Sequence, residues 1–566
     1  MEAIVYNIDV SYWLGWTWLA CVVALAAYLT AVTFVRYIRG IACLNNPAQR
    51  YFAEPNALYG QFKRYLFDAP LFRTRHHREF KLSAAINVGT LPGRLQMIYL
   101  VAYFGMNVAF SVIYIDWSSA EAVSHDLRNR TGVLAVMNML PLFLLAGRNN
   151  PLIKLTGISF DTFNLVHRWI GRIVILQALT HTLAWMVPKV NESGWSAVGK
   201  SMAGSQFILW GTIGTVALLI ILLQAASAVR HAFYELFLHF HVLLAAASVA
   251  GVYIHCQAGG LPQLPIIQGV LAIWVIERFI RLFLIGLRNV GNGGTKAEVS
   301  MLPGDALLIN LKIARPWKFA TGQHVYLYLP SVGWWTSHPF SLAWSETEEP
   351  WTEEKGLSMP SEEVLTTTKT TMSLLVKRRT GFTDKLFRKA EASPTGKFTT
   401  SALVEGPYGH QDLTSYGTVM LFAAGIGITH QVPHIRNLVA AFDNHTAAVR
   451  RIRLVWVVQS PEHLQWIHPW MTTILSMPQR RECLKIQIFV TRPRSTREIY
   501  SPSASVQMFP GRPNIQALVD QEMIEGVGAA AVSVCGTGGL ADDVRRAVRK
   551  RQTEWNVDFF EEAFSW

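Results

Sequence analysis

The sequence predicts a membrane bundle of seven transmembrane helices, followed by a soluble half with an antiparallel β-barrel lobe and a parallel α/β lobe. Apolar residues make up 51% of the 566-residue chain, and they are concentrated before about residue 288. This apolar half contains seven spans, each long enough to cross a hydrocarbon core of about 30 Å. Beyond residue 295, short strands of alternating polarity give way at residue 418 to strand, glycine turn and helix. That second pattern is typical of a parallel sheet.

The charge of the loops predicts the orientation of the spans. The loop at 36–94 carries ten Lys or Arg against three Asp or Glu. By the positive-inside rule this loop is cytosolic, so the N-terminus is outside and the C-terminal half is in the cytosol. No charged segment precedes the first span, which indicates an anchor and not a cleaved signal peptide. The predicted spans are residues 13–37, 95–115, 131–147, 161–187, 206–229, 232–254 and 266–288.

These patterns divide the chain into four predicted domains. Residues 1–94 hold the first transmembrane helix and the basic loop, and residues 95–288 form a six-helix transmembrane domain. Residues 295–414 form the barrel lobe, and residues 415–566 form the α/β lobe. Residues 345–370 are acidic and rich in threonine, and we predict a mobile loop there.

The distribution of charge argues against nucleic-acid binding, and the cysteine content argues against a zinc site. The net charge of +13 is compatible at first sight with nucleic-acid binding. Much of the excess lies in loops between membrane spans, so we predict lipid, and no nucleic acid, as the partner of those charges. The five cysteines contain no C-x-x-C pair and no disulfide framework, so we expect no zinc site.

Two of the apolar spans each carry a pair of histidines. His167 and His181 lie fourteen residues apart, as do His241 and His255. On an α-helix this spacing is about 3.9 turns and a rise of roughly 21 Å, so each pair shares one helix face at two depths. Two such helices side by side form two facing pairs, which is the geometry of two stacked haems with histidine on both faces.

A purely structural role for these histidines is the alternative, because a lone histidine on an apolar helix is usually a core or boundary residue. Four histidines inside membrane spans are costly, and their matched spacing favours a functional role. His239 lies about 160° away from the face of His255 and is therefore left out. Arg168 and Arg172 can neutralise haem propionates or can anchor the helix at the interface, and the sequence leaves both open.

Two motifs of the barrel lobe point to a flat cofactor with a pyrophosphate. His338-Pro339-Phe340-Ser341 follows a predicted barrel strand, where an aromatic ring can pack with a hydroxyl near its reactive edge. Alone, this sequence is an ordinary turn. Further on, a strand ends in a basic run and a helix begins at Gly381-Phe382-Thr383. The backbone N–H groups at that helix start, with Lys377 and Arg379, form a candidate pyrophosphate site.

A third turn is predicted to join the two lobes. Residues 404–409, which include Gly406 and Pro407, form a rigid connection there.

In the α/β lobe, glycine turns follow two of the predicted strands. Gly425, Gly427 and Thr429 lie where the first strand ends and a helix begins. Glycines allow dinucleotide phosphates to approach the backbone, and the helix N-terminus favours their charge. Cys535 and Gly536 close a later strand at the same edge of the sheet.

Three further residues are candidates for nucleotide contacts. Arg492 and Arg512 follow sheet strands and can contact a 2′-phosphate, which favours NADPH over NADH, or they are solvated loop arginines. The terminal Trp566 can stack on a flavin and be displaced by nicotinamide, or it can simply pack.

Taken together, these motifs resemble those of fungal ferric reductases in the ferric reductase/NADPH oxidase superfamily. The resemblance extends from about residue 95 to Trp566 and rests on the paired histidines, HPFS, GFT, GPYG, GIGIT, CGTGG and the terminal EExFxW pattern. It implies that the soluble half is a ferredoxin-NADP-reductase-like module with FAD on the barrel lobe and NADPH on the α/β lobe. It also implies two b-type haems in the membrane and catalytic roles for Ser341, Cys535 and Trp566.

The resemblance further implies a reaction and a place for it. Electrons pass from NADPH to FAD, to the inner haem, to the outer haem and then to ferric chelates or siderophores outside, with cupric ions as a second acceptor. FAD suits this order because it accepts a hydride and releases single electrons. The implied location is the plasma membrane, with functional coupling to an iron-uptake permease.

Two alternatives share part of this pattern. A superoxide-generating NADPH oxidase has the same sequence of cofactors, with O₂ as the electron acceptor. In such an oxidase we expect the two histidines of the second pair to lie thirteen residues apart, whereas they lie fourteen apart in this chain. A transporter with a regulatory nucleotide-binding domain leaves the four histidines unexplained.

Overall fold

The computed structural model describes two compact units of the chain. The described residues are 2–76, 91–226, 230, 233–291, 293–334, 336–348, 369–493, 495, 499, 501 and 503–562. The first unit comprises residues 1–33 and 77–281, and the second comprises residues 34–76 and 282–566.

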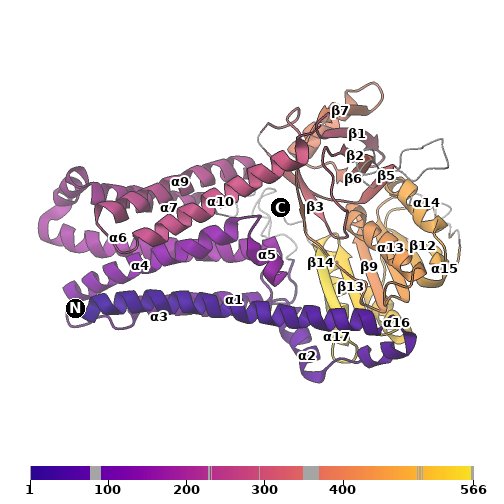
Figure 1. The fold of residues 1–566 in the computed structure, drawn as a ribbon, viewed down its shortest axis with the longest axis horizontal. Coiled ribbons are helices and arrows are strands. Elements are labelled where there is room, and N and C mark those ends of the chain that lie inside the picture. The colour runs from indigo at the N-terminus through magenta and orange to yellow at the C-terminus, as the bar shows by residue number, and fades with distance from the viewer. Residues whose placement is uncertain are drawn as a thin grey trace, which may run out of the picture. The chain divides into compact units, whose positions relative to one another are not determined.

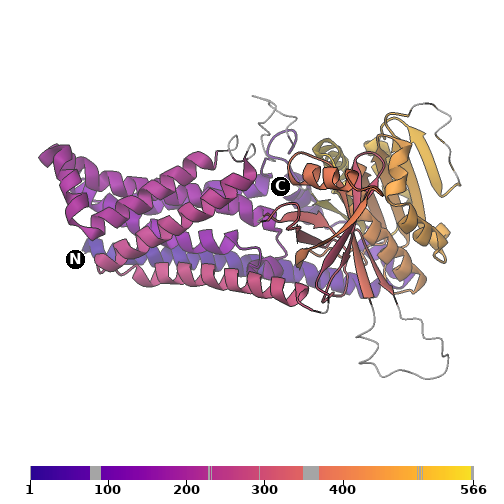
Figure 2. The same cartoon turned by 90° about the horizontal axis from the view of Figure 1, so that it is seen from above.

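The apolar half forms long helices that run alongside one another (Figures 1 and 2). Six helices among the described residues have the length and composition to cross a membrane, so this is a multi-pass membrane protein. They are α1 (Glu2–Ala42), α3 (Arg94–Val112), α4 (Ala120–Ala146), α6 (Phe160–Gly204), α7 (Gln206–Gln224) and α9 (Tyr234–Ala258). The short helix α5 (Pro151–Thr156) lies between α4 and α6 in the sequence.

The seventh predicted span overlaps helix α10 (Leu264–Asn289). This helix is not among the six, because Glu277, Arg278 and Arg281 lie close together in it. Each predicted span thus overlaps a helix, but the predicted count of seven transmembrane helices is not confirmed.

Two contacts inside the bundle show what fixes the helix packing. A Cβ on Gly251 of α9 would lie 2.8 Å from the Cα of Gly214 on α7, so only small residues fit at this crossing. Asn138 of α4 donates hydrogen bonds to Asn107 of α3 at 2.6 Å and to Gln177 of α6 at 3.0 Å. An unpaired amide at membrane depth costs several kcal/mol, so this polar cluster ties the three helices together.

The second unit contains an antiparallel lobe built from two sheets. Their strand orders are β5-β6-β2-β1-β7 and β4-β3-β8. The elements are β1 (Lys296–Leu302), β2 (Ala306–Lys312), β3 (His324–Tyr328), β4 (His338–Ser341), β5 (Trp344–Glu348), β6 (Lys369–Lys377), α12 (Phe382–Glu391), β7 (Lys397–Ser401) and β8 (Leu403–Tyr408). The antiparallel strands predicted from the sequence at β1, β2 and β3 are confirmed.

Three predictions for this lobe are corrected. His338–Ser341 is strand β4 and not a turn, and residues 404–408 belong to strand β8. In the predicted loop 345–370, residues 345–348 lie in β5 and residues 369–370 lie in β6, while residues 349–368 lie outside the described residues. These segments pair with distant strands, and local composition does not reveal such pairing.

A six-stranded parallel sheet of order β12-β11-β10-β9-β13-β14 forms the remaining lobe. Its strands are β9 (Thr418–Ala424), β10 (Arg451–Val458), β11 (Leu484–Val490), β12 (Val506–Pro510), β13 (Ala530–Cys535) and β14 (Val557–Glu562). Its helices are η3 (Gly425–Gly427), α13 (Ile428–Asp443), η4 (Pro461–Trp466), α14 (His468–Ser476), α15 (Arg480–Cys483), α16 (Ile515–Glu525) and α17 (Gly538–Arg551). The predicted parallel sheet is confirmed, with edge strands β12 and β14 in addition. The strand order reverses at β9, and ligands bind such sheets at the carboxyl ends of the strands beside that point.

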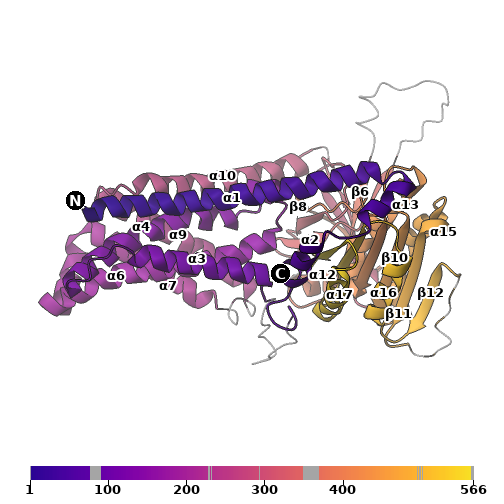
Figure 3. The ribbon, with the colours of Figure 1, turned by 90° about the horizontal axis from the view of Figure 1, so that it is seen from below.

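Residues 34–76, which follow the membrane-spanning part of α1, belong to the same compact unit as this lobe. They contain the end of α1, then η1 (Asn46–Phe52), α2 (Ala57–Phe62) and η2 (Lys63–Phe67). Figures 1 and 3 show α2 beside α17. One bond that holds the segment, from Arg39 to Ser415, joins residues 376 positions apart, a separation that no local pattern predicts.

Candidate functional site

The structure brings the four predicted histidines together as two facing pairs in the helical unit. His167 of α6 faces His241 of α9, with ring centroids 6.3 Å apart. His181 of α6 faces His255 of α9, with ring centroids 6.1 Å apart. His239 is exposed and belongs to neither pair.

Backbone carbonyls fix the protonation of three of these rings. The Nδ1 atoms of His167, His181 and His255 lie 2.9, 2.7 and 2.7 Å from carbonyl oxygens of Leu142, Arg128 and Phe207. A carbonyl oxygen only accepts, so each Nδ1 carries the proton and each Nε2 keeps a lone pair. This is the second-sphere arrangement that prepares histidine for metal ligation.

Two glycines lie against the rings of the His181–His255 pair, where a larger residue would not fit. A Cβ on Gly132 would lie 2.7 Å from Nδ1 of His181, and a Cβ on Gly211 would lie 2.7 Å from Nδ1 of His255. The His241 Nδ1 is buried without a hydrogen-bond partner among the described residues. Four imidazoles in facing pairs are a donor set that fits two bis-histidine haems.

The two arginines that follow His167 differ in their surroundings. The Nε atom of Arg168 is buried and has no hydrogen-bond partner in the described part of the chain. The guanidinium of Arg172 is exposed and lies 4.5 Å from the ring centroid of Trp169. Arg168 is therefore the better candidate for a haem propionate, and Arg172 fits an interfacial anchor.

In the barrel lobe, the HPFS and GFT motifs meet. The rings of His338 and Phe382 stack with centroids 4.2 Å apart and an interplanar angle of 21°. Pro339 pairs with Tyr326 of β3, and Phe340 pairs with Val325. Ser341 is buried at the end of β4.

The candidate pyrophosphate site lies at the start of α12. Gly381 has φ 78°, and a Cβ on it would point into open space, so a ligand can approach the backbone there. The Thr383 hydroxyl accepts the backbone N–H of Arg379 at 2.9 Å. Arg378 is held by Asp384 at 2.7 Å, and Lys377 ends the adjoining strand β6.

In the α/β lobe, the two glycines of the first turn have different surroundings. Gly425 has φ 52° and would direct a Cβ into open space, whereas a Cβ on Gly427 would lie 2.1 Å from the carbonyl oxygen of Cys535. Trp456 donates a hydrogen bond of 3.0 Å to the carbonyl of Gly425 and fixes this turn. Gly425 can thus admit a phosphate, while Gly427 permits close packing of the two turns.

The remaining predicted residues lie at the carboxyl edge of the same sheet, in strand β8 of the barrel lobe, or outside the described residues. Cys535 is buried at the end of β13 beside Gly536, and Thr429 donates to the carbonyl of Ile426 at 2.9 Å. Arg492 and Arg512 are both exposed. Gly406 and Pro407 lie in β8, where a Cβ on Gly406 would be 3.3 Å from a methyl group of Val325. Trp566 lies outside the described residues.

Comparison with known families decides between the interpretations of this architecture. A model of the ferric reductase-like transmembrane component matches residues 131–252. A model of an FAD-binding domain matches residues 292–412, and a model of the ferric reductase NAD-binding domain matches residues 416–549. The chain therefore contains a ferric reductase-like transmembrane domain, an FAD-binding domain and a ferric reductase NAD-binding domain.

The chain is similar to fungal ferric reductases over most of its length. It is 26% identical to a probable ferric reductase transmembrane component of Candida albicans, over 89% of this chain and 76% of that protein. It is 26% identical to ferric/cupric reductase transmembrane component 1 of Candida albicans, over 89% of this chain and 67% of that protein. It is 24% identical to ferric/cupric reductase transmembrane component 2 of Saccharomyces cerevisiae, over 96% of this chain and 76% of that protein.

The barrel lobe also contains buried polar residues that the motifs do not include. Glu405 is fully buried in β8 and accepts hydrogen bonds from Tyr328 at 3.0 Å and Tyr408 at 2.9 Å. His324 pairs with Ser341 across β3 and β4. The available signal was an acid inside the apolar run that precedes Gly406, since buried carboxylates need partners.

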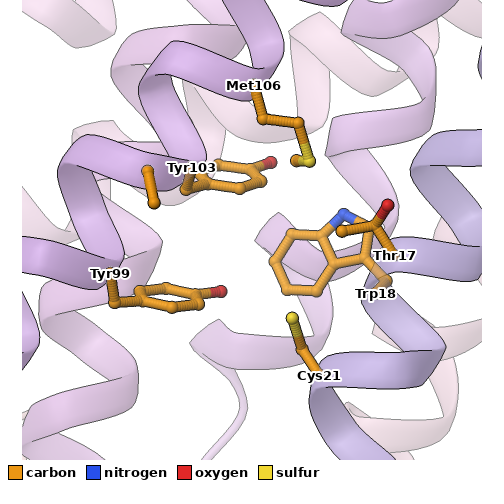
Figure 4. Close-up of a pocket in the computed structure, with 7 residues that line it drawn as sticks. Thr17, Trp18, Cys21, Tyr99, Tyr103 and Met106 are labelled. Atoms are coloured by element: carbon orange, nitrogen blue, oxygen red, sulfur yellow. The ribbon is translucent and has the colours of Figure 1, made fainter.

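A small pocket of about 130 Å³ opens between α1 and α3 (Figure 4). Its lining residues are Thr17, Trp18, Cys21, Tyr99, Ala102, Tyr103 and Met106. None of the predicted site residues lines it, so it has no part in the proposal below.

Proposed function

We propose that this ferric reductase moves electrons from cytosolic NADPH, through FAD and two b-type haems, to ferric chelates or cupric ions on the outer side. The observation that carries the proposal is the pair of facing histidine couples on α6 and α9. They lie in a chain that also matches FAD- and NAD-binding domain models. The proposed location is the plasma membrane, with the N-terminus outside and the reduced iron passed to an uptake permease.

The histidines determine what the membrane part can do. Bound haems would supply one-electron carriers at two depths. His167 with His241 would hold one haem, and His181 with His255 would hold the other. Because a histidine would hold each haem from either side, the ferric chelate would take its electron at the outer edge of the site and would not bind to the haem iron.

The soluble unit supplies the hydride path. Ser341 would present its hydroxyl to the reactive edge of the flavin, and Lys377 and the open start of α12 at Gly381 would hold its pyrophosphate. Gly425 admits the phosphates of NADPH, and Cys535 and Gly536 border its nicotinamide. One hydride brings two electrons, so each NADPH reduces two ferric ions and leaves NADP⁺ and one proton.

Selectivity for NADPH is expected to depend on the exposed arginines at the carboxyl edge of the sheet. Replacing Arg492 and Arg512 with alanine should raise KM for NADPH about tenfold or more and leave KM for NADH nearly unchanged, because only NADPH carries the 2′-phosphate. Steady-state ferric-chelate reduction with each nucleotide measures both constants. Arg481→Ala is the matched control, since this exposed arginine precedes β11 at the opposite edge. Equal losses with both nucleotides would contradict the assignment.

The acceptor is tested in sealed vesicles that contain the purified protein. With NADPH on the side of the soluble unit and Fe(III)-EDTA trapped on the other, ferrous iron should appear inside the vesicles at two per NADPH. The yield should not change on adding superoxide dismutase. Dye reduction that superoxide dismutase abolishes would identify an oxidase, and protein purified without haem would indicate a transporter.

A further inference from the structure

Residues 34–76, here called the brace, are built into the nucleotide lobe. Arg39, Gln49 and Lys63 are 4%, 2% and 5% exposed. Long polar side chains are rarely so buried unless they are paired. Figure 3 shows the brace helix α2 beside α17, as does Figure 1.

Three contacts anchor the first part of the brace. Lys63 Nζ lies 2.6 Å from Asp558 Oδ1 on β14. Gln49 Nε2 donates to the carbonyl of Ala448 at 2.6 Å, and the Arg39 guanidinium donates to Ser415 at 2.9 Å. Burial would raise the pKa of Asp558, but Lys63 and Arg36 lower it to about 2, so the carboxylate stays ionised beside its cations.

The last two residues of the brace contact the end of the nucleotide site. The backbone N–H groups of Arg75 and His76 donate to the two carboxylate oxygens of Asp542 on α17, each at 3.0 Å. The Arg75 guanidinium lies 3.1 Å from Glu561 Oε2, and His76 Nε2 lies 3.2 Å from Glu561 Oε1. Glu561 also pairs with Arg545.

These contacts surround the turn that contains Cys535. A Cβ on Gly538 would lie 2.6 Å from the Cβ of His76, so His76 packs directly against this turn. Glu561 pairs in register with Val534, the residue before Cys535. Arg75 and His76 therefore contact both the helix start that follows Cys535 and the strand that lies beside it.

We propose that Arg75 and His76 are positioning residues for hydride transfer, because they hold the Cys535–Gly538 turn and strand β14 at the nicotinamide end of the site. The inference rests on the proposed function of that turn. It makes the segment after the first transmembrane helix a working part of the nucleotide site. Neither residue touches the reacting atoms, and both act through Gly538 and Glu561.

The test uses the full-length protein with its haems and flavin. Arg75→Ala and His76→Ala are compared with Arg73→Ala, an exposed arginine of the same segment. Flavin reduction by NADPH is followed by anaerobic stopped flow, with unlabelled NADPH and NADPH deuterated at the transferred position. Both variants should slow the limiting rate of flavin reduction about tenfold and increase its isotope effect, because misplacement of the nicotinamide slows the transfer itself. Arg73→Ala should match the wild type.

Rescue and coupling separate positioning from simple destabilisation. Arg75→Lys keeps a cation opposite Glu561 and should recover most of the rate. Glu561→Gln should slow the rate at least as much as Arg75→Ala does, and the double variant should be no slower than Glu561→Gln, since both substitutions remove the contact between Arg75 and Glu561.

Three outcomes bear on the proposal in different ways. Wild-type rates and isotope effects in folded Arg75→Ala and His76→Ala would overturn it, even if the variants unfold at a lower temperature. If the alanine variants lose flavin, wild-type rates in Glu561→Gln would overturn it instead. A wild-type protein whose flavin NADPH cannot reduce would contradict the proposed function and not this inference.

Discussion

Replacing His241 with leucine is expected to remove one haem per chain and to lower NADPH-driven reduction of a ferric chelate about 100-fold or more. The reason is that His241 faces His167 at 6.3 Å between ring centroids, so leucine leaves that pair with one ligand. The haem-to-flavin ratio of the purified variant, measured by pyridine haemochrome, should fall from two to one. Reduction of the flavin by NADPH should persist, because the matched FAD- and NAD-binding segments lie in the other compact unit.

His239→Leu is the matched control, since His239 lies on the same helix and is exposed. It should keep both haems and full activity. A normal haem ratio in His241→Leu, or equal losses in the two variants, would show that the facing pairs are not the ligands.

Replacing Gly427 with alanine is expected to destroy the nucleotide site and to lower the free energy of unfolding of this lobe by about 3 kcal/mol. The new Cβ would lie 2.1 Å from the carbonyl oxygen of Cys535 and 3.1 Å from the Cα of Gly536. Both obstacles are backbone, so the turn after β9 must separate from the turn after β13. Anaerobic flavin reduction by NADPH should be lost, while dithionite should still reduce the haems.

Gly425→Ala is the informative comparison. Its Cβ would meet open space, so the cost is limited to about 1 kcal/mol for the left-handed backbone at φ 52°. The variant should fold and show a raised KM for NADPH, because the methyl group occupies the face that a phosphate approaches. Normal NADPH-dependent flavin reduction in Gly427→Ala would refute the close packing of the two turns.

The parts of the fold that follow a local periodicity of the sequence were predictable. The fourteen-residue spacing of His167 and His181, repeated in His241 and His255, predicts one helix face and therefore the two facing pairs that the structure contains. Alternating and continuous apolar runs predicted the antiparallel and parallel sheets in the same way. The turn residues next to these strands were identified because glycine and helix starts are local signals.

Contacts between distant residues were not predictable. Lys63 looked like one cation among many in a basic loop, and only the folded chain places it 2.6 Å from Asp558. The hydrogen bond between Glu405 and Tyr328 was not predictable, because Tyr328 comes from another strand. The two glycines of GIGIT looked equivalent, and their difference depends on Cys535, which is more than a hundred residues further along the chain.

The absorbance spectrum of the detergent-purified protein, recorded before and after NADPH is added without oxygen, tests the central claim most directly. Sharp low-spin haem bands should appear on NADPH addition, with two haems and one flavin per chain. Haem that only dithionite reduces would contradict the flavin and nucleotide assignments. Protein without haem would contradict the role given to His167, His181, His241 and His255.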